Sequence, residues 1–277
     1  MKHKKINTID LFCGCGGLSK GFQDAGYNVL FGIDVEQSAL NTYERNMNGA
    51  KGINLDLSAS ESFDQIEKLL NGKTLDVIIG GPPCQGFSLT GERNFDDERN
   101  RLYLAFIESV KRFRPSAFMI ENVPGMANLY KGHVKDEVIR RFTELGYNMS
   151  WKILCAADYG VPQIRKRLFF VGLRDSETNF DFPTPYLKEE DYITCEQAIS
   201  DLPPLVDVLG EEISRYEMTP KTDFQRLMRR DNDVLYNHVA IAHKQFVKDV
   251  IALVPDGGNY KDLPEGVRSE ERRVGKE

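Results

Sequence analysis

The sequence predicts an α/β protein built on an open, mostly parallel β-sheet with helices on both faces. Short apolar runs rich in β-branched residues, each typical of a buried parallel strand, alternate with segments of helical periodicity up to residue 173. Several of these runs end in glycine or an acidic residue, as strands do where they open onto a crevice at the carboxyl edge of such a sheet. We therefore expect about seven strands. From residue 175 onward, prolines increase and periodicity weakens, which indicates a second region.

The composition is that of an ordinary globular protein, with 41% apolar and 28% charged residues in 277. No run approaches the ~20 apolar residues that span a bilayer, and the N-terminal apolar segment is too short for a signal peptide. Five cysteines at irregular spacings indicate reduced thiols in a cytosol and no metal site. The net charge of −6 argues against general affinity for nucleic acid, although an acidic enzyme can carry one basic cleft.

The first strand is expected at residues 8–12, before the glycine-rich turn Cys13-Gly14-Cys15-Gly16-Gly17 and a helix that stops at Gly26. Strand, glycine turn and helix together are typical of a nucleotide-binding turn. Glycines let a ligand approach the backbone, and the first amides of the helix face it. A plain tight turn is the alternative.

Two further strands are expected to end in acids. The strand at 28–33 ends in Asp34, a position suited to a bidentate grip on ribose hydroxyls, although Asp34 could also cap a helix at 36–46. The strand near 52–55 ends in Asp56, which could accept from an adenine amino group. Asp56 taken alone is more typical of a turn.

The stretch GGPPCQGFS, residues 80–88, follows a helix at 61–71 and a buried strand at 75–79. Its glycines and prolines end regular structure and hold the backbone in a stiff turn. Cys84 is therefore expected where a strand opens onto the crevice, while a buried cysteine in a rigid loop is the alternative. A substrate-facing loop over 90–100 and an amphipathic helix over 101–113 follow.

A second acid is expected at the same edge, because the strand at 116–120 ends in Glu121-Asn122-Val123. Arg165 and Arg167 precede an apolar strand at 168–173 and are expected to point to one face of it. The other expected elements are a strand over 148–155 and helices over 134–145 and 235–254.

Four separated blocks resemble the ordered motifs of the DNA (cytosine-5) methyltransferases, namely DLFCGCGG, GGPPCQGFS, ENV and QIRKR, within residues 6–174. The resemblance implies an S-adenosyl-methionine-dependent methyltransferase fold in residues 1–174, with S-adenosyl-L-methionine as co-substrate and no metal. It also implies a monomer that acts on a cytosine flipped out of double-stranded DNA. Such an enzyme would be a restriction–modification or solitary enzyme of prokaryotic type in the cytoplasm. An RNA (tRNA) cytosine methyltransferase and a non-catalytic cofactor- or DNA-binding module are the alternatives.

The resemblance assigns catalytic roles to Cys84, Glu121, Arg165 and Arg167. A Cys84 thiolate would add to carbon 6 of cytosine and make carbon 5 nucleophilic enough to take a methyl group. Glu121, buried and protonated near neutral pH, would hydrogen-bond ring nitrogen 3, while Arg167 would contact the cytosine carbonyl. Arg165 would order the Cys84 loop or the base pocket. The matching cofactor-binding positions are Phe12, Gly14, Gly16, Gly17, Asp34, Asp56, Leu57, Pro82 and Leu102.

The sequence departs from the family's pattern after the linker. The family's later Arg-Glu-Ala-Ala-Arg-like and Gly-Asn-Ala-Val-Pro-like blocks are not found. We therefore expect residues 175–267 to be a linker and the incomplete start of a target-recognition region, and the chain to be inactive on DNA. Residues 268–277 can be back-translated into a common sequencing-adapter sequence and are expected to be a non-native tail.

Overall fold

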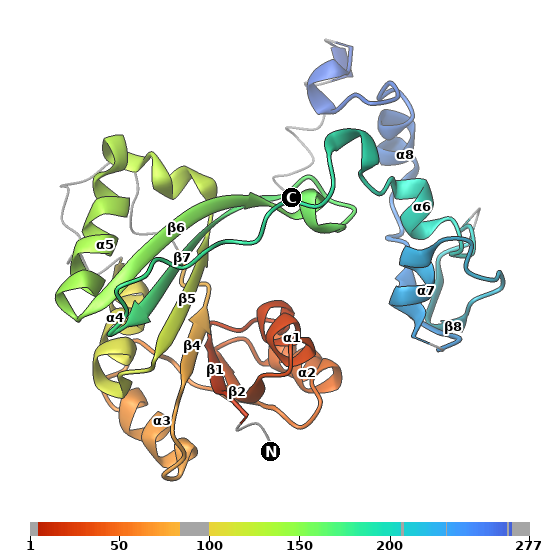
Figure 1. Cartoon of the computed structure of the whole chain (residues 1–277). Coiled ribbons are helices and arrows are strands. Elements are labelled where there is room, and N and C mark those ends of the chain that lie inside the picture. Colours follow the sequence, from red (N-terminus) through yellow and green to blue (C-terminus); the bar gives the residue numbers. More distant parts are fainter. Residues whose placement is uncertain (1–4, 84–99, 206–207, 231, 265, 268–277) are drawn as a thin grey trace. The chain divides into compact units, whose positions relative to one another are not determined.

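The computed structural model describes residues 5–83, 100–205, 208–230, 232–264 and 266–267. The chain divides into two compact units, Met1–Ile193 and Thr194–Glu277 (Figure 1). This division lies later than the boundary at residue 174 that the sequence suggests. Residues 175–193 stay with the first unit through hydrogen bonds: the Phe180 amide donates to the Ser150 hydroxyl at 2.9 Å, and the Leu187 amide donates to the Asp158 carbonyl at 3.1 Å. The expected non-native tail at 268–277 lies outside the described residues.

The first unit contains a seven-stranded sheet in the order β3-β2-β1-β4-β5-β7-β6. Neighbouring strands from β3 to β5 are parallel, whereas β7 runs antiparallel to both β5 and β6. The prediction of an open, mostly parallel sheet is therefore confirmed. The strands are β1 (Asn7–Leu11), β2 (Asn28–Asp34), β3 (Lys51–Asn54), β4 (Val77–Gly80), β5 (Ala117–Asn122), β6 (Tyr147–Cys155) and β7 (Lys166–Arg174).

The described α-helices of the first unit cover the sheet, with α1 and α2 on one face and α3, α4 and α5 on the other (Figure 1). Successive side chains of β1 point to opposite faces of the sheet, so alternate residues pack against different helices. Ile9 and Leu11 join the large apolar core with α3 to α5, whereas Thr8 and Asp10 are buried on the α1 side. The helices are α1 (Gly17–Asp24), α2 (Gln37–Asn46), α3 (Ser62–Leu70), α4 (Arg101–Phe113) and α5 (His133–Glu144).

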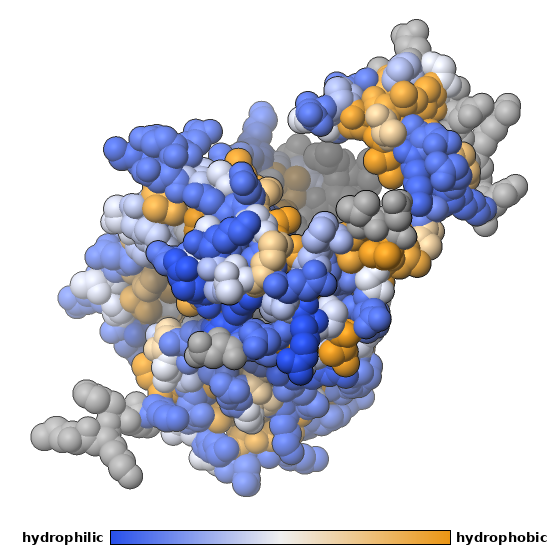
Figure 2. Space-filling view, turned by 90° about the vertical axis from the view of Figure 1, so that its right-hand side faces the viewer, coloured by the Kyte–Doolittle hydropathy of each residue, from blue (hydrophilic) through white to orange (hydrophobic). Residues whose placement is uncertain are grey.

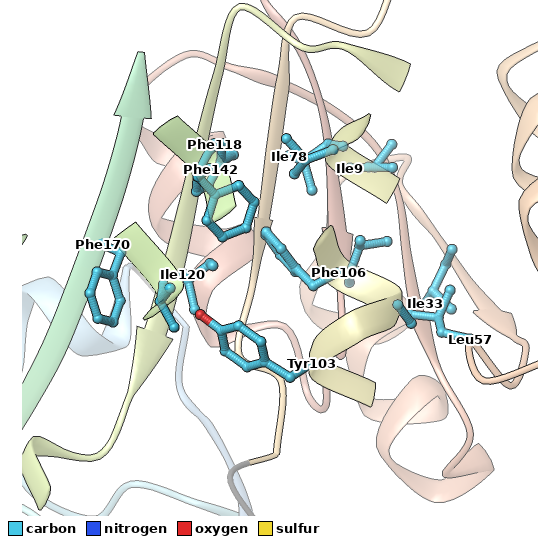
Figure 3. Packing of buried hydrophobic residues seen from close by; sticks show 14 of the residues in the cluster. Ile9, Ile33, Leu57, Ile78, Tyr103, Phe106, Phe118, Ile120, Phe142 and Phe170 are labelled. Carbon is cyan, nitrogen blue, oxygen red and sulfur yellow. The ribbon is translucent and has the colours of Figure 1, made fainter. Parts of the chain in front are cut away.

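An aromatic cluster at the centre of this core fixes the strands that carry the site (Figure 3). Phe118 of β5 packs against Phe142 of α5 with ring centroids 4.2 Å apart, and Phe106 of α4 lies 6.1 Å from Phe118. Gly172 of β7 makes room for this cluster, because a Cβ atom there would lie 2.2 Å from the Phe118 ring. Close packing of this kind holds β5 and β7 in one arrangement.

The described part of the second unit contains short helices and a two-stranded antiparallel sheet. The expected helix over 235–254 is wrong in its first part, because Val234–Val239 forms β9, which pairs with β8. Helical structure begins only at Gln245. The elements are α6 (Cys195–Ile199), β8 (Gly210–Arg215), α7 (Asp223–Arg229), β9 (Val234–Val239) and α8 (Gln245–Ile251).

A buried ion pair lies inside this unit. The guanidinium of Arg229 approaches the Asp201 carboxylate to 2.6 Å and lies over the Tyr216 ring at 3.6 Å from its centroid. Large apolar side chains nevertheless remain exposed on the same unit, among them Ile213 and Tyr236, which lie opposite each other on β8 and β9. Figure 2 shows that apolar side chains gather in patches on an otherwise largely hydrophilic surface.

No helix within the described parts of the chain is both long and apolar enough to cross a bilayer.

Candidate active site

The glycine-rich turn begins where β1 ends and leads into α1. Its backbone is left-handed at Phe12 (φ 64°), Gly14 (φ 51°) and Gly16 (φ 88°). A left-handed conformation strains a bulky residue such as Phe12 and persists only where the surroundings fix it. Here the amide of Cys13 donates to the Ile33 carbonyl at 3.0 Å, which binds the turn to β2. Gly17 is the exposed first residue of α1.

Asp34, at the end of β2, ties that strand to the glycine turn. Its Oδ2 accepts from the Gly14 amide at 2.9 Å and its Oδ1 accepts from the Glu36 amide at 3.0 Å. Asp34 is not the cap of α2, because Glu36 takes that position and accepts from the Ser38 amide at 3.1 Å. The half-buried Asp34 carboxylate is therefore next to the glycine turn, as the ribose hypothesis requires.

Asp56 adopts the turn geometry that the sequence left open as its alternative role. Its Oδ1 accepts from the Ser58 amide at 2.8 Å and from the Ser58 hydroxyl at 2.6 Å. These hydrogen bonds, with a smaller contribution from Arg101, lower the pKa of Asp56 below its ordinary value. Leu57 beside it is buried, and Leu102 in the first turn of α4 is half-buried.

The start of the GGPPCQGFS stretch is held against the end of β5. The side-chain amide of Asn122 donates to the Pro82 carbonyl at 3.0 Å, and its Oδ1 accepts from the Val123 amide at 2.8 Å. Glu121 Oε2 lies against Gly81, only 3.3 Å from where a Cβ atom would be. Cys84 itself lies outside the described residues.

Glu121 and Arg167 contact each other directly, with Nε of Arg167 2.6 Å from Oε1 of Glu121. The side chains are 30% and 23% exposed, respectively. Glu121 is therefore half-buried against a guanidinium, whereas the sequence predicts a carboxyl group buried in an apolar crevice. The contact forms because β7 lies beside β5 and brings its first residues to the carboxyl edge, where Glu121 pairs with Phe169 in register.

Arg165 directly precedes β7, which begins at Lys166, and its side chain is exposed. Its amide donates to the Gln163 carbonyl at 2.8 Å, and its carbonyl accepts from the Ala156 amide at 2.9 Å. The bond from Ala156 continues the pairing of β6 with β7 by one residue. That Arg165 and Arg167 point to the same face stays a prediction.

Among the described cysteines, Cys13 is unsuited to nucleophilic chemistry. It is buried, and this burial raises the pKa of its thiol far above the ordinary value, with smaller contributions from the Asp10 and Asp34 carboxylates. A thiol held protonated is a poor nucleophile. Cys13 therefore does not compete with the role that the sequence gives to Cys84.

A comparison with known protein families shows to which family the chain belongs. The family described as C-5 cytosine-specific DNA methylase matches the chain over residues 6–261. The chain belongs to this methylase family. The resemblance drawn from the four sequence blocks is thereby confirmed.

Its relatives are Type II methyltransferases. The chain is 40% identical over 266 residues to M.DdeI of Desulfomicrobium norvegicum, covering 94% of this chain and 63% of that protein. It is 36% identical over 220 residues to M.AquIA of Picosynechococcus sp., covering 71% of this chain and 88% of that protein. Among solved structures, a prophage-encoded E. coli protein described as a DNA modification methyltransferase matches with a TM-score of 0.72 and 28% identity, covering 90% of this chain and 76% of the other. These matches confirm the methyltransferase fold.

C-5 methylases as a class use S-adenosyl-L-methionine, and the glycine turn fits such a ligand. A Cβ atom added at Gly14 or Gly17 would meet no atom of the described residues within 4 Å, which leaves room there for a ligand to approach the backbone. The Asp34 carboxylate offers acceptors suited to a ribose diol beside this open backbone. Among the described residues, no group of three or more His, Cys, Asp or Glu side chains could hold a metal ion.

Sequence reasoning missed several residues that shape the methylase site. Asn122 could have been suspected from its place directly after Glu121 at a strand end. Asp10 carried a signal too, since a charged residue at the centre of an apolar strand must be accommodated by partners or by a proton. Ser19 and Tyr43, which contact each other, had no signal, because only the fold brings them together.

Asp10 is a buried acid beneath the glycine turn, with 1% of its surface exposed. Its Oδ2 accepts from the Ser19 hydroxyl at 2.7 Å, whereas its Oδ1 has no hydrogen-bond partner among the described residues. Burial raises the pKa of Asp10 to about 7, although hydrogen bonds from Ser19 act in the opposite direction. The nearby Asp34 carboxylate adds a smaller upward contribution.

Replacing Asp10 with asparagine is expected to change the pH dependence of stability. Because the folded-state pKa is raised from 3.8 to about 7, the folded protein keeps a proton that the unfolded chain has released across that window. The wild type therefore loses stability as pH rises from about 4 to about 7, by on the order of 2–4 kcal/mol, and no further above that range. Urea unfolding of wild type and Asp10→Asn at pH 5 and pH 8 measures this. Relative to wild type, the variant should be more stable at pH 8 than it is at pH 5. If the difference in unfolding free energy between variant and wild type were the same at both pH values, the raised pKa of Asp10 would be contradicted.

Proposed function

We propose that this chain carries the catalytic region of a DNA cytosine-5 methyltransferase of the restriction–modification kind. The contact between Glu121 and Arg167 supports this most directly, because it places an acid and a guanidinium at one strand edge beside Gly81. Those two groups are the ones needed to bind the polar edge of a cytosine. The hydrogen bond from Asn122 to the Pro82 carbonyl anchors the loop that continues to Cys84.

Cys84 is proposed as the nucleophile. Its thiolate forms a bond to carbon 6 of a cytosine turned out of the DNA duplex, and the electron pair of the 5,6 double bond becomes available at carbon 5. Carbon 5 would then attack the methyl group of the sulfonium, whose carbon–sulfur bond breaks with its electron pair staying on that sulfur. Loss of the carbon-5 proton to water and cleavage of the bond between the Cys84 sulfur and carbon 6 would restore the aromatic ring and the thiolate.

Glu121 and Arg167 are proposed to hold the base during this addition. Glu121 hydrogen-bonds ring nitrogen 3 and shares a proton with it, while Arg167 donates to the carbonyl oxygen. Arg165, exposed in the turn before β7, is proposed to order the loop that carries Cys84.

The co-substrate S-adenosyl-L-methionine supplies an activated methyl group on a sulfonium centre when bound. We propose that the turn residues Phe12, Gly14, Gly16 and Gly17 take its methionine part and that Asp34 takes its ribose. Asp56 and Leu57 are proposed to take the adenine, with Pro82 and Leu102 at the rim.

Asp34→Ala is expected to weaken S-adenosyl-methionine binding by about 1.5–3 kcal/mol, the scale of hydrogen bonds to a charged group. Calorimetric titration of the chain measures the affinity directly. Glu36→Ala serves as a control, since it removes only the cap of α2 at a neighbouring position. Equal affinity of Asp34→Ala and wild type would remove Asp34 from the cofactor site.

Double-stranded DNA is proposed as the substrate over RNA. The curated relatives with 35–40% identity are Type II methyltransferases, whereas the likeness to the Dnmt2 structure from S. pombe, at 19% identity, shows the fold alone. Transfer of labelled methyl groups to duplex DNA and to tRNA, offered in parallel, tests this. Preferential labelling of tRNA would favour the RNA alternative.

We also propose that the 277 residues alone do not methylate DNA. The net charge is −6, and large apolar side chains stay exposed on the second unit. We therefore propose that these residues alone do not make enough phosphate contacts to bind DNA, and that further protein residues must supply the rest. Residues 1–267 and the protein in its natural full length can be compared for turnover on duplex DNA. Equal turnover would refute this proposal. We further propose that the active protein is a monomer, and sedimentation would measure its oligomeric state. Because its proposed substrate is DNA, we propose that it acts in the prokaryotic cytoplasm.

A further inference from the structure

Three side chains from three different elements form a buried hydrogen-bonded chain beneath the glycine turn. Ser19 in the first turn of α1 donates to Asp10 of β1 at 2.7 Å. Tyr43 of α2 places its hydroxyl 3.1 Å from the Ser19 hydroxyl. All three are almost fully buried, with exposures of 1% or less. The chain therefore connects β1, α1 and α2 at the point where the glycine turn leaves the sheet.

The ring of Tyr43 packs against the glycine turn itself. A Cβ atom at Gly16 would lie 2.7 Å from the Tyr43 ring, so the ring contacts the backbone of the turn directly. A Cβ atom at Gly32 of β2 would lie 2.7 Å from both the Tyr43 ring and the Cys13 sulfur. Tyr43 thus fills the space between Gly32 of β2 and Gly16 of the turn.

We propose that Ser19 and Tyr43 are positioning residues that hold the glycine turn in its ligand-binding shape by anchoring it to Asp10. This inference rests on the proposed cofactor site and adds residues that do not touch the ligand. The backbone at Gly16 is left-handed, and α1 begins without a side-chain cap there. Contacts from neighbouring side chains must therefore help to hold the turn. Tyr43 packs against Gly16, and Ser19 links Tyr43 to Asp10.

The direction of the hydrogen bonds follows from the chemistry of Asp10. Ser19 donates to Oδ2, so its oxygen is free to accept from the Tyr43 hydroxyl. A proton on Asp10 would reside on Oδ1, the oxygen without a partner, and would leave the bond from Ser19 intact. Asparagine can present the same acceptor to Ser19, so Asp10→Asn should preserve the chain of contacts. Ser19→Ala instead leaves both Asp10 Oδ2 and the Tyr43 hydroxyl without that partner.

The test measures binding of S-adenosyl-homocysteine, which has no methyl group to transfer, to the whole chain by calorimetry. We expect about 10-fold weaker binding for Ser19→Ala and about 3-fold for Tyr43→Phe, because a loosened turn must be ordered on binding. Asp10→Asn should stay within about 2-fold of wild type.

Two matched controls separate positioning from general stability. Ser109→Ala removes a buried helical hydroxyl that donates to the Ala105 carbonyl in α4, and Tyr147→Phe removes a buried hydroxyl that donates to the Pro115 carbonyl. Both should lower the melting temperature as much as their counterparts while leaving the affinity unchanged. Equal affinity losses in controls and test variants would overturn the inference.

Hydrogen exchange of the ligand-free chain gives a second readout that needs no ligand. Amides from Cys13 to Lys20 should exchange faster in Ser19→Ala than in Ser109→Ala, while amides of β4 should not differ. Unchanged exchange of the turn would contradict the inference even if binding fell. If wild type did not bind S-adenosyl-homocysteine at all, the proposed cofactor site would fail, and the exchange measurement would still decide the role of Ser19.

Discussion

Replacement of Cys84 by serine is expected to abolish methyl transfer, with a loss of at least about 10³-fold, because serine lacks a thiolate and is a far weaker nucleophile near neutral pH. The same variant should fail to form a stable adduct with DNA that carries 5-fluorocytosine. The fluorine cannot leave carbon 5 as a proton does, so the wild-type sulfur stays bonded to carbon 6. Incubation of the natural full-length protein with S-adenosyl-methionine and the fluorinated duplex allows the adduct to be measured by mass spectrometry.

Cys13→Ser and Cys15→Ser are suitable controls for this experiment. Cys13 is buried with a raised thiol pKa, and Cys15 is exposed in the same turn. Neither replacement should prevent the adduct. A covalent adduct that persists in Cys84→Ser would remove Cys84 from the mechanism.

Glu121→Gln is expected to lower the rate of methyl transfer by about 10²–10⁴-fold, the range for loss of a general acid or base. Glutamine keeps the shape of the side chain but cannot share a proton with ring nitrogen 3 or carry the charge that pairs with Arg167. Stability should change by no more than about 1 kcal/mol, because the pair with Arg167 is partly exposed to solvent. Single-turnover methylation and urea unfolding of the same preparation measure both effects.

Glu137→Gln is the matched control for this prediction. Glu137 of α5 is 25% exposed and pairs with Arg141 at 2.7 Å, so it resembles Glu121 in exposure and pairing but lies in α5 and not at the carboxyl edge of the sheet. Its replacement should leave the rate unchanged. A rate loss for Glu121→Gln no larger than that for Glu137→Gln would show that Glu121 has no catalytic role.

The core of the fold could be predicted because the central strands β1 and β4 are buried on both faces and the helices that cover the sheet are buried on one. The apolar runs at β1, β4 and β5 are typical of buried strands, and the glycines that follow β1 and β4 predict where those two strands end. The antiparallel direction of β7 was not predicted, since a buried run has the same pattern in either direction. The short connection between β6 and β7 was the available signal, because parallel strands need a longer crossover.

The second unit was harder to predict because little of it is buried. The residues of β9 alternate along a two-stranded sheet that has solvent on much of its surface, and their apolar members merged with those of α8 into one helical pattern. Pairing with β8 decides the structure of this segment. The pairing of β9 with β8 cannot be predicted from the periodicity of the sequence.

At the site, the sequence identified which residues lie at the carboxyl edge but not how they pair. Glu121 and Arg167 are far apart in the chain, so their contact depends on the position of β7 beside β5. Asp34 was expected at the glycine turn, and its bond to the Gly14 amide agrees with that placement. Tyr43 could not be found, because its ring reaches the turn only through the packing of α2.

The position of the transferred methyl group tests the central claim most directly. Duplex DNA methylated by the natural full-length protein should be digested to nucleosides and analysed by chromatography with mass spectrometry. The account predicts that 5-methyl-2′-deoxycytidine is the product and that it disappears in Cys84→Ser. Methylation of the exocyclic amine of cytosine, or of adenine, would contradict it, since neither reaction requires attack on carbon 6.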